Sequence, residues 1–275
     1  MTLLERMASF DDPPWEQQSP EDFRALRKSR WRQSQRAVHA IDEVDAGGVP
    51  ARLYRPSEAT GLPLLVWLHG GGWVGGDLDS HDDLCRAVAV RAGAVVLSVD
   101  YGLAPERPFP GGLTDALDAL RWAHEHAADL GADPALVALG GDSAGGNIAA
   151  VVSQLAPVPL VFQVLVYPVT DARFGWPSFT ENGEGLFLTA AGMRWFLNHY
   201  LSGGQGAADD PRVSPLLAPD DAFRAQPPTL VITAEYDPLR DEGEAYAARM
   251  IELGVPCTLT RYDGMIHGFV TLADY

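Results

Sequence analysis

A serine between two glycines is the feature of the sequence that most clearly indicates covalent chemistry. Ser143 stands in the pattern Gly-x-Ser-x-Gly, with Gly141 and Gly145 on either side. Residues 136–140 before it are typical of a buried strand, and residues 147–154 after it are typical of a helix. A nucleophilic serine on a sharp strand-to-helix turn needs this context, because bulkier flanking residues would collide. The alternative is an ordinary serine in a glycine-rich turn.

A second glycine-rich segment, residues 69–73, also follows a predicted buried strand. Its three glycines leave backbone N–H groups unshielded, so the loop can approach a substrate closely. Acyl-transfer enzymes need such donors where the tetrahedral intermediate develops its oxyanion. The amides of Gly71, Gly72 and Ala144 are therefore the candidate donors, and we expect His69 to hold the loop in place. A plain flexible loop is the alternative.

A serine alcohol is a weak nucleophile, so it needs a general base that is itself oriented by a carboxylate. In enzymes with this serine motif, the acid and then the histidine follow the serine along the chain. Five of the seven histidines precede Ser143, and His199 lies in an aromatic, helix-like segment. His267 follows the last predicted strand. His267 is therefore the predicted base.

The partner acid is less constrained by position than the histidine. Asp237 directly follows a predicted strand, which places it at the same sheet edge as the serine. Glu235, Asp241 and Asp263 are nearby alternatives. We expect Asp241 in the first turn of the next helix, where a carboxylate suits the helix dipole, and Asp263 is very close to His267 in sequence. Asp237 is the predicted acid.

The elements that must position these residues alternate along the chain. The predicted strands are 39–44, 50–54, 64–68, 94–99, 136–139, 160–166, 230–233 and 258–262. The predicted helices are 20–38, 82–91, 112–128, 144–154, 189–201 and 238–253. Short, continuous apolar runs suit strands buried on both faces of a parallel sheet. The pattern predicts a doubly wound α/β fold, with its first two strands forming an antiparallel hairpin.

One stretch, residues 171–215, is rich in aromatic residues and contains no obvious strand. We interpret it as an insert above the sheet. We predict a single domain over 1–275, with a cap from about 1–40 and 171–215 and a catalytic core from about 41–170 and 216–275. The aromatic residues considered for substrate binding are Trp73, Trp176, Phe179 and Phe187.

The charge and composition narrow the range of partners. The 275 residues include 20 basic and 37 acidic ones, a net charge of −17. A chain this acidic repels phosphate backbones, so we expect a small-molecule substrate and no nucleic acid. The sequence holds no dinucleotide-binding, P-loop or paired-cysteine zinc pattern, which predicts neither cofactor nor metal. The sequence allows a homodimer but does not decide the oligomeric state.

The hydrophobic pattern indicates no targeting or membrane segment. The first residues carry acids and prolines where a secretory signal needs an apolar run. The longest apolar stretch, around 155–169, is interrupted by prolines and a glutamine. We therefore expect a soluble, cytoplasmic protein without a membrane span.

Several segments together resemble the hormone-sensitive-lipase family of α/β-hydrolases, the bacterial family IV esterases. These segments are 69–73, 100–106, 108–110, 141–146, 237–243 and 267–269. The resemblance implies an α/β-hydrolase fold with a helical cap, hydrolysis of small, short-acyl carboxylic esters, and no cofactor. Carried over, it makes Ser143 the nucleophile, Asp237 the acid and His267 the base, with the oxyanion hole formed by Gly71, Gly72 and Ala144.

Two features depart from the family pattern. Gly102 stands where family members usually carry arginine, which we expect to loosen the local turn without touching the chemistry. The chain ends at Tyr275, where family members usually continue into a closing helix, and this bears on stability and oligomerisation.

Two other functions fit parts of the same pattern. An amidase or deacetylase, such as an arylformamidase-like enzyme, uses the same triad. A ligand-binding homologue without catalysis, like the plant gibberellin receptors, lacks a working histidine, whereas this chain has His267.

Overall fold

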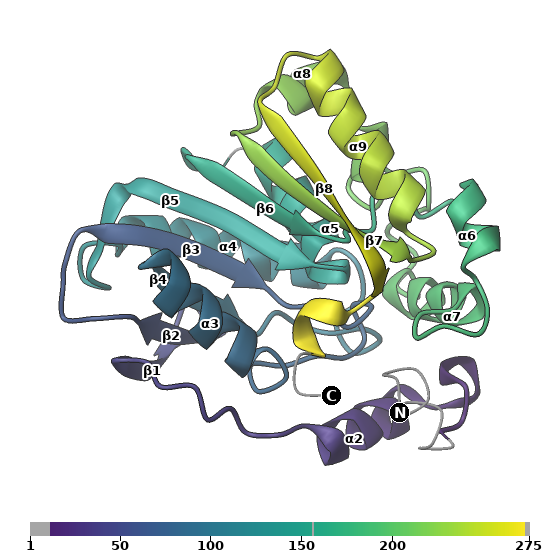
Figure 1. Cartoon of the computed structure of the whole chain (residues 1–275), viewed down its shortest axis with the longest axis horizontal. Helices are drawn as coiled ribbons and strands as arrows, with labels where there is room; N and C mark the ends of the chain where they lie inside the picture. The colour runs from purple at the N-terminus through teal and green to yellow at the C-terminus, as the bar shows by residue number, and fades with distance from the viewer. Residues whose placement is uncertain (1–11, 156, 273–275) are drawn as a thin grey trace.

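The computed structural model describes residues 12–155 and 157–272. A twisted eight-stranded sheet forms its centre, with strand order β1-β2-β4-β3-β5-β6-β7-β8 (Figure 1). The strands are β1 (Ala40–Asp45), β2 (Pro50–Arg55), β3 (Leu62–Leu68), β4 (Val95–Val99), β5 (Ala132–Asp142), β6 (Phe162–Val166), β7 (Thr229–Tyr236) and β8 (Cys257–Ile266). β1 pairs antiparallel with β2 and β2 with β4, and all other pairs are parallel. The predicted α/β fold with a mostly parallel sheet is confirmed.

Helices cover the two faces of the sheet unequally. The helices are α2 (Pro20–Arg30), α3 (Asp82–Ala92), α4 (Gly111–Glu125), α5 (Ala144–Leu155), α6 (Pro177–Glu181), α7 (Ala190–Tyr200), α8 (Asp220–Arg224) and α9 (Arg240–Glu252), with short 3-10 turns η1 (Trp15–Gln17), η2 (Pro215–Leu217) and η3 (Phe269–Thr271). Residues of α4, α5 and α9 share the larger buried core with the strands. On the other face, α3 packs against β2 and β4.

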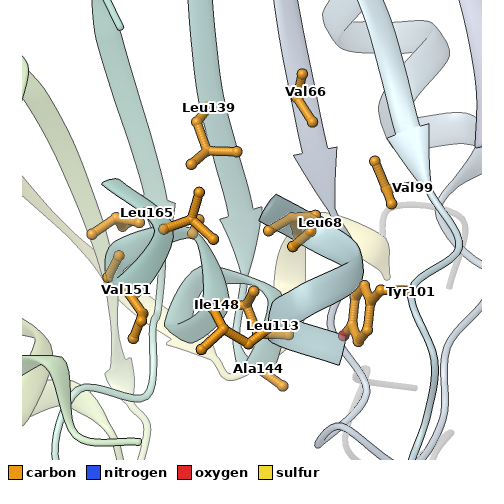
Figure 2. Packing of buried hydrophobic residues seen from close by; sticks show 14 of the residues in the cluster. Val66, Leu68, Val99, Tyr101, Leu113, Leu139, Ala144, Ile148, Val151 and Leu165 are labelled. Atoms are coloured by element: carbon orange, nitrogen blue, oxygen red, sulfur yellow. The ribbon is translucent and has the colours of Figure 1, made fainter. Parts of the chain in front are cut away.

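The larger core lies between the middle strands and α4 and α5 (Figure 2). Leu68 and Leu139 from β3 and β5 meet Ile148 from α5 and Leu113 from α4, and all four side chains are buried. Truncating a leucine in such a core to alanine costs about 2–5 kcal/mol. This packing fixes the ends of β3 and β5, the two strands that lead into the glycine-rich segments.

The N-terminal helix differs from its prediction. α2 begins after the cap Ser19, whose Oγ accepts the amide of Asp22 at 3.1 Å. It ends at Arg30 rather than at residue 38, because Trp31 has an extended backbone with φ −61° and ψ 146°. The chain beyond it lies against α3 instead, where the guanidinium of Arg36 donates to Asp83 at 3.2 Å.

Two segments far apart in sequence lie side by side over the sheet's carboxyl edge. Figure 1 shows α2 beside α7. Phe23 of α2 packs against Trp195 and Phe196 of α7, with ring centroids 5.6 and 5.4 Å apart. Residues 1–11 of the predicted cap lie outside the described residues. The short helices α6 and α8, five residues each, have no counterpart among the predicted elements.

Candidate active site

Ser143 lies on the sharp turn between β5 and α5. Its φ of 53° is in the left-handed region, an uncommon conformation for a residue with a side chain. A Cβ at Gly141 would come within 2.5 Å of the Gly145 backbone, and one at Gly145 within 2.0 Å of the Leu68 carbonyl oxygen. Only glycine fits at these two positions, so the two glycines of the motif are sterically required.

A continuous series of hydrogen-bonding contacts joins the serine to a buried carboxylate. His267 Nε2 lies 2.9 Å from Ser143 Oγ, and His267 Nδ1 lies 2.7 Å from Asp237 Oδ2. The second oxygen of Asp237 accepts the Leu239 amide at 2.8 Å, and its side chain is fully buried. The imidazole also packs on Tyr167, with ring centroids 4.4 Å apart. The carboxylate therefore fixes the ring with one nitrogen directed at the serine.

Two of the other acids considered from the sequence, Asp241 and Glu235, have different partners. Asp241 accepts the Ser178 amide at 2.8 Å and pairs with Arg240. Glu235 accepts the Gly264 amide at 2.6 Å. Within residues 12–155 and 157–272, the hydrogen bonds of the His267 ring to a carboxylate go to Asp237 alone.

The first glycine-rich loop borders the same cavity as the serine. Gly71 and Gly72 have φ values of 128° and 63°, and both line the cavity with Ser143. Ala144 is the first residue of α5, so its amide is one of the N–H groups left without an intrahelical partner at a helix start. The loop after β3 and the start of α5 thus both adjoin Ser143.

His69 is buried behind this loop. Its Nδ1 is 2.9 Å from the Gly70 carbonyl oxygen, and its ring stacks on Tyr101 with centroids 4.4 Å apart. Burial, followed by the positive charge of nearby His81, lowers the pKa of His69 to about 4. The ring is therefore neutral at pH 7, and Nδ1–H can donate to Gly70.

A cavity of about 830 Å³ opens above the serine. This is within the usual range for small-molecule sites. Its lining includes Phe23, Gly71, Gly72, Leu103, Ser143, Tyr167, Val169, Leu186, Phe187, Leu188, Met193, Phe196 and His267. The wall combines these apolar side chains with charged ones such as Arg27, Lys28 and Asp77, and it is contributed by α2, the insert and the core.

Comparison with known proteins is consistent with this geometry. The sequence profile of an α/β-hydrolase-fold family matches residues 65–271. The chain belongs to this α/β-hydrolase family. Carboxylic ester hydrolase LipN of Mycobacterium tuberculosis is 48% identical over 237 residues, 82% of this chain and 62% of LipN. Carboxylesterase NlhH of the same organism is 47% identical over 231 residues, 82% of this chain and 72% of NlhH.

Solved structures show the same relationship. A thermostable esterase from Pseudomonas putida superposes with a TM-score of 0.91 at 38% identity, over 98% of this chain and 88% of that one. The esterase from Pyrobaculum calidifontis gives 0.88 at 40% identity, over 98% and 90%. The chain spans 62% of the length of LipN and 72% of the length of NlhH.

The aromatic residues considered for substrate binding lie in different places in this α/β hydrolase. Phe187 lines the cavity. Trp73 is buried and stacks on Tyr200, and Phe179 is buried and stacks on Phe174. Trp176 is half-buried and donates its indole N–H to Asp171. The last three do not line the cavity.

Sequence reasoning missed several cavity residues, among them Tyr167, Met193, Phe196 and Phe23. Tyr167 follows the end of β6 just as Ser143 follows the end of β5, which is a positional signal. Met193 and Phe196 are three residues apart on α7, and such spacing places side chains on one helix face. Phe23 lies on α2, inside the predicted cap segment 1–40, but no local pattern marked its side chain as facing the cavity.

Arg107 lies against the glycine that departs from the family pattern. A Cβ at Gly102 would stand 2.5 Å from Arg107 Cδ. Arg107 pairs with Asp115 at 2.6 Å, and the Gly102 amide donates to the same carboxylate at 2.8 Å. The turn is thus tied to α4 through Asp115.

No helix among residues 12–155 and 157–272 is long and apolar enough to cross a membrane. Within the same residues, no three histidine, cysteine or acidic side chains are grouped in a way that could hold a metal ion.

Proposed function

We propose that the protein hydrolyses small carboxylic esters with short acyl chains through an acyl-enzyme. Ser143 is the nucleophile, His267 the general base and Asp237 the acid that orients it. The observation that carries this proposal is the hydrogen-bonded series from Ser143 Oγ through both nitrogens of His267 to a buried Asp237.

The chemistry proceeds in two halves. Ser143 Oγ attacks the ester carbonyl carbon while its proton passes to His267 Nε2, and the imidazolium is stabilised by Asp237. The imidazolium then protonates the leaving alcohol, which gives the acyl-enzyme. In the second half His267 takes a proton from water, the hydroxide attacks the acyl carbon, and the proton returns to Ser143 as the acid departs.

The oxyanion that forms in each half is bound, in this proposal, by the amides of Gly71, Gly72 and Ala144. Losing one such donor typically costs about 3 kcal/mol in the barrier. Two of these amides come from the loop after β3, and the third comes from the start of α5.

The preference for short acyl chains rests on the space beside this loop. A Cβ at Gly72 would come within 2.3 Å of the Phe196 ring, so the cap presses directly on the loop there. One relative, 42% identical, is an ethyl acetate hydrolase of Pseudomonas putida. We propose that the insert at about 171–215 and the N-terminal segment together form the cap that limits acyl size.

A panel of p-nitrophenyl esters of increasing acyl length, with matched anilides, tests this function. We expect the highest kcat/KM on acetate or butyrate, little turnover of anilides, and loss of all ester turnover in Ser143→Ala. The short-acyl proposal fails if long chains are preferred. Faster turnover of the anilides would favour the amidase.

We further propose that the protein forms a homodimer. The contact surface is the part of the sheet, on strands β5 to β8, that lies on the same face as α3 but is not covered by it. Leu136, Phe162 and Tyr262 are 38%, 38% and 44% exposed there. Strands of a parallel sheet are normally covered on both faces. β8 is also an edge strand, and a second copy supplies an identical strand that can pair with it antiparallel.

Sedimentation of the purified chain tests the dimer. We expect a dimer that tightens as salt rises, because two chains of charge −17 repel each other at low ionic strength. Phe162→Lys with Tyr262→Lys should give monomers, whereas Ile251→Lys, on exposed α9, should not. A wild-type monomer at every salt concentration would contradict the proposal. The cytoplasmic location stays a prediction.

A further inference from the structure

Asp142, the residue just before Ser143, carries a buried carboxylate that the triad does not use. Its side chain is 5% exposed. Oδ1 accepts the Gly70 amide at 3.1 Å and lies 3.0 Å from His81 Nε2. Oδ2 lies 3.1 Å from the same nitrogen. The carboxylate thus joins the serine turn, the oxyanion loop and the start of α3.

The contact between this carboxylate and the loop is tight. A Cβ at Gly70 would stand 2.4 Å from Asp142 Oδ2, so only glycine lets the loop approach this closely. The loop glycines proposed as oxyanion donors follow Gly70 directly in the chain. Any movement of the Asp142 carboxylate therefore displaces the start of that loop.

His81 is placed to act as the counter-ion of Asp142. Its side chain is 7% exposed. Its Nδ1 lies 3.0 Å from Ser80 Oγ, and the hydroxyl hydrogen of Ser80 is directed to the Asp77 carbonyl oxygen at 2.7 Å. Nε2 faces the Asp142 carboxylate and also lies 3.2 Å from the Gly70 amide, so His81 contacts both the carboxylate and the start of the loop.

The charge of Asp142 is consistent with this arrangement. Burial alone would raise the pKa of the carboxyl group, but the charge of His81 and the hydrogen bonds from His81 and Gly70 outweigh it and lower the pKa. A buried charge that loses its partner is strongly unfavourable. Here it would also stand beside the site where the negative oxyanion develops.

We propose that His81 is a positioning residue of the oxyanion hole. It neutralises and holds Asp142, and Asp142 in turn fixes the Gly70 amide and the loop that follows. This inference rests on the proposed function. Without His81, an uncompensated carboxylate would both release the loop and oppose the oxyanion, so the loss should fall on the transition state rather than on substrate binding.

The test compares kcat and KM for p-nitrophenyl acetate in four variants. We expect His81→Leu to lower kcat about 100-fold, the usual cost of one oxyanion donor, with KM changed by less than about threefold. Adding Asp142→Asn to His81→Leu removes the stranded charge and keeps an acceptor for Gly70, so it should restore kcat at least about tenfold.

Tyr54→Phe is the matched control for a purely structural effect. Tyr54 donates a buried hydrogen bond at 2.9 Å to Asp82, which is the residue directly after His81. Its loss should lower Tm and leave kcat unchanged. The inference is overturned if His81→Leu keeps kcat within threefold, if Asp142→Asn brings no recovery, or if kcat in all variants merely follows Tm.

The Ser143→Ala variant, measured alongside, separates this inference from the proposed function. If wild type hydrolyses the ester and Ser143→Ala does not, the function holds and the His81 variants decide the inference alone. If Ser143→Ala retains activity, the proposed function fails, and the inference fails with it.

Discussion

Two buried histidine–aspartate pairs flank the same serine, and they differ in which ring nitrogen faces the carboxylate. In the pair of His267 and Asp237, Nδ1 faces the acid and Nε2 is left to face Ser143. In the pair of His81 and Asp142, Nε2 faces the acid and Nδ1 faces a hydroxyl whose hydrogen is already donated elsewhere.

The difference shows why a similar pair of side chains serves two purposes. His267 can accept a proton because its free nitrogen faces an alcohol. The contacts of His81 are with Asp142, the Gly70 amide and Ser80 rather than with Ser143. The first pair suits proton transfer, and the second suits holding charge and backbone in place.

The largest expected effect breaks the first pair. His267→Ala should lower kcat for a short-chain ester by about 100,000-fold or more, because the serine loses the group that takes its proton. Steady-state kinetics on purified protein, with circular dichroism as the folding control, measures this. A loss near the 100-fold expected for His81→Leu would mean that the two pairs do not differ in role.

The next effect concerns the acid of the same pair. Asp237→Asn should lower kcat by about 10,000-fold while the fold is retained. An amide favours the wrong imidazole tautomer and does not stabilise the imidazolium. Asp241→Asn is the matched control, since Asp241 binds the Ser178 amide instead. Equal losses in both variants would argue against Asp237.

A smaller effect is expected where the second pair acts, in the oxyanion loop. Gly72→Ala should lower kcat about 100-fold, because its φ of 63° disfavours a side chain and the new methyl group would meet Phe196. Combining it with Phe196→Ala removes the clash and should recover part of the loss. Full activity in Gly72→Ala would show that the loop tolerates displacement.

The smallest effect on turnover is expected at His69. This residue should instead make the unfolding free energy depend on pH. Its ring centroid lies 5.6 Å from that of His81. Its pKa is about 4 when folded, against 6.5 unfolded. Between these pH values the unfolded chain binds more protons, so the unfolding free energy falls as pH drops from 6.5 to about 4. The loss amounts to about 3 kcal/mol from this group.

Urea unfolding across this pH range measures the His69 contribution. His69→Asn retains an amide donor for Gly70 and should lose less stability than wild type as pH falls. Parallel losses in the two proteins would mean that other groups account for the acid sensitivity.

The sequence predicted the parts of the site that depend on local constraints. The flanking glycines of Ser143 mark a turn that only glycine permits, and Asp237 and His267 follow strands whose apolar runs are clear. β5 and β8 extend the predicted strands toward these residues. The choice among acids also followed from strand position, although only the structure shows that Asp241 and Glu235 have other partners.

The remaining features depend on contacts that no local pattern encodes. Trp73 and Phe187 are both aromatic residues in loops, yet one stacks in the core and the other lines the cavity. His81 and Asp142 are 61 residues apart and meet only because β3 and β5 are neighbours in the sheet. The end of α2 at Arg30 likewise reflects binding of Arg36 to a distant helix.

Covalent labelling tests directly whether Ser143 is the nucleophile of an acyl-enzyme. Wild type is treated with a fluorophosphonate, and the modified peptide is identified by mass spectrometry. We expect a single adduct on Ser143, slowed greatly in His267→Ala and absent in Ser143→Ala. An adduct on another residue, or undiminished labelling of Ser143→Ala, would contradict it.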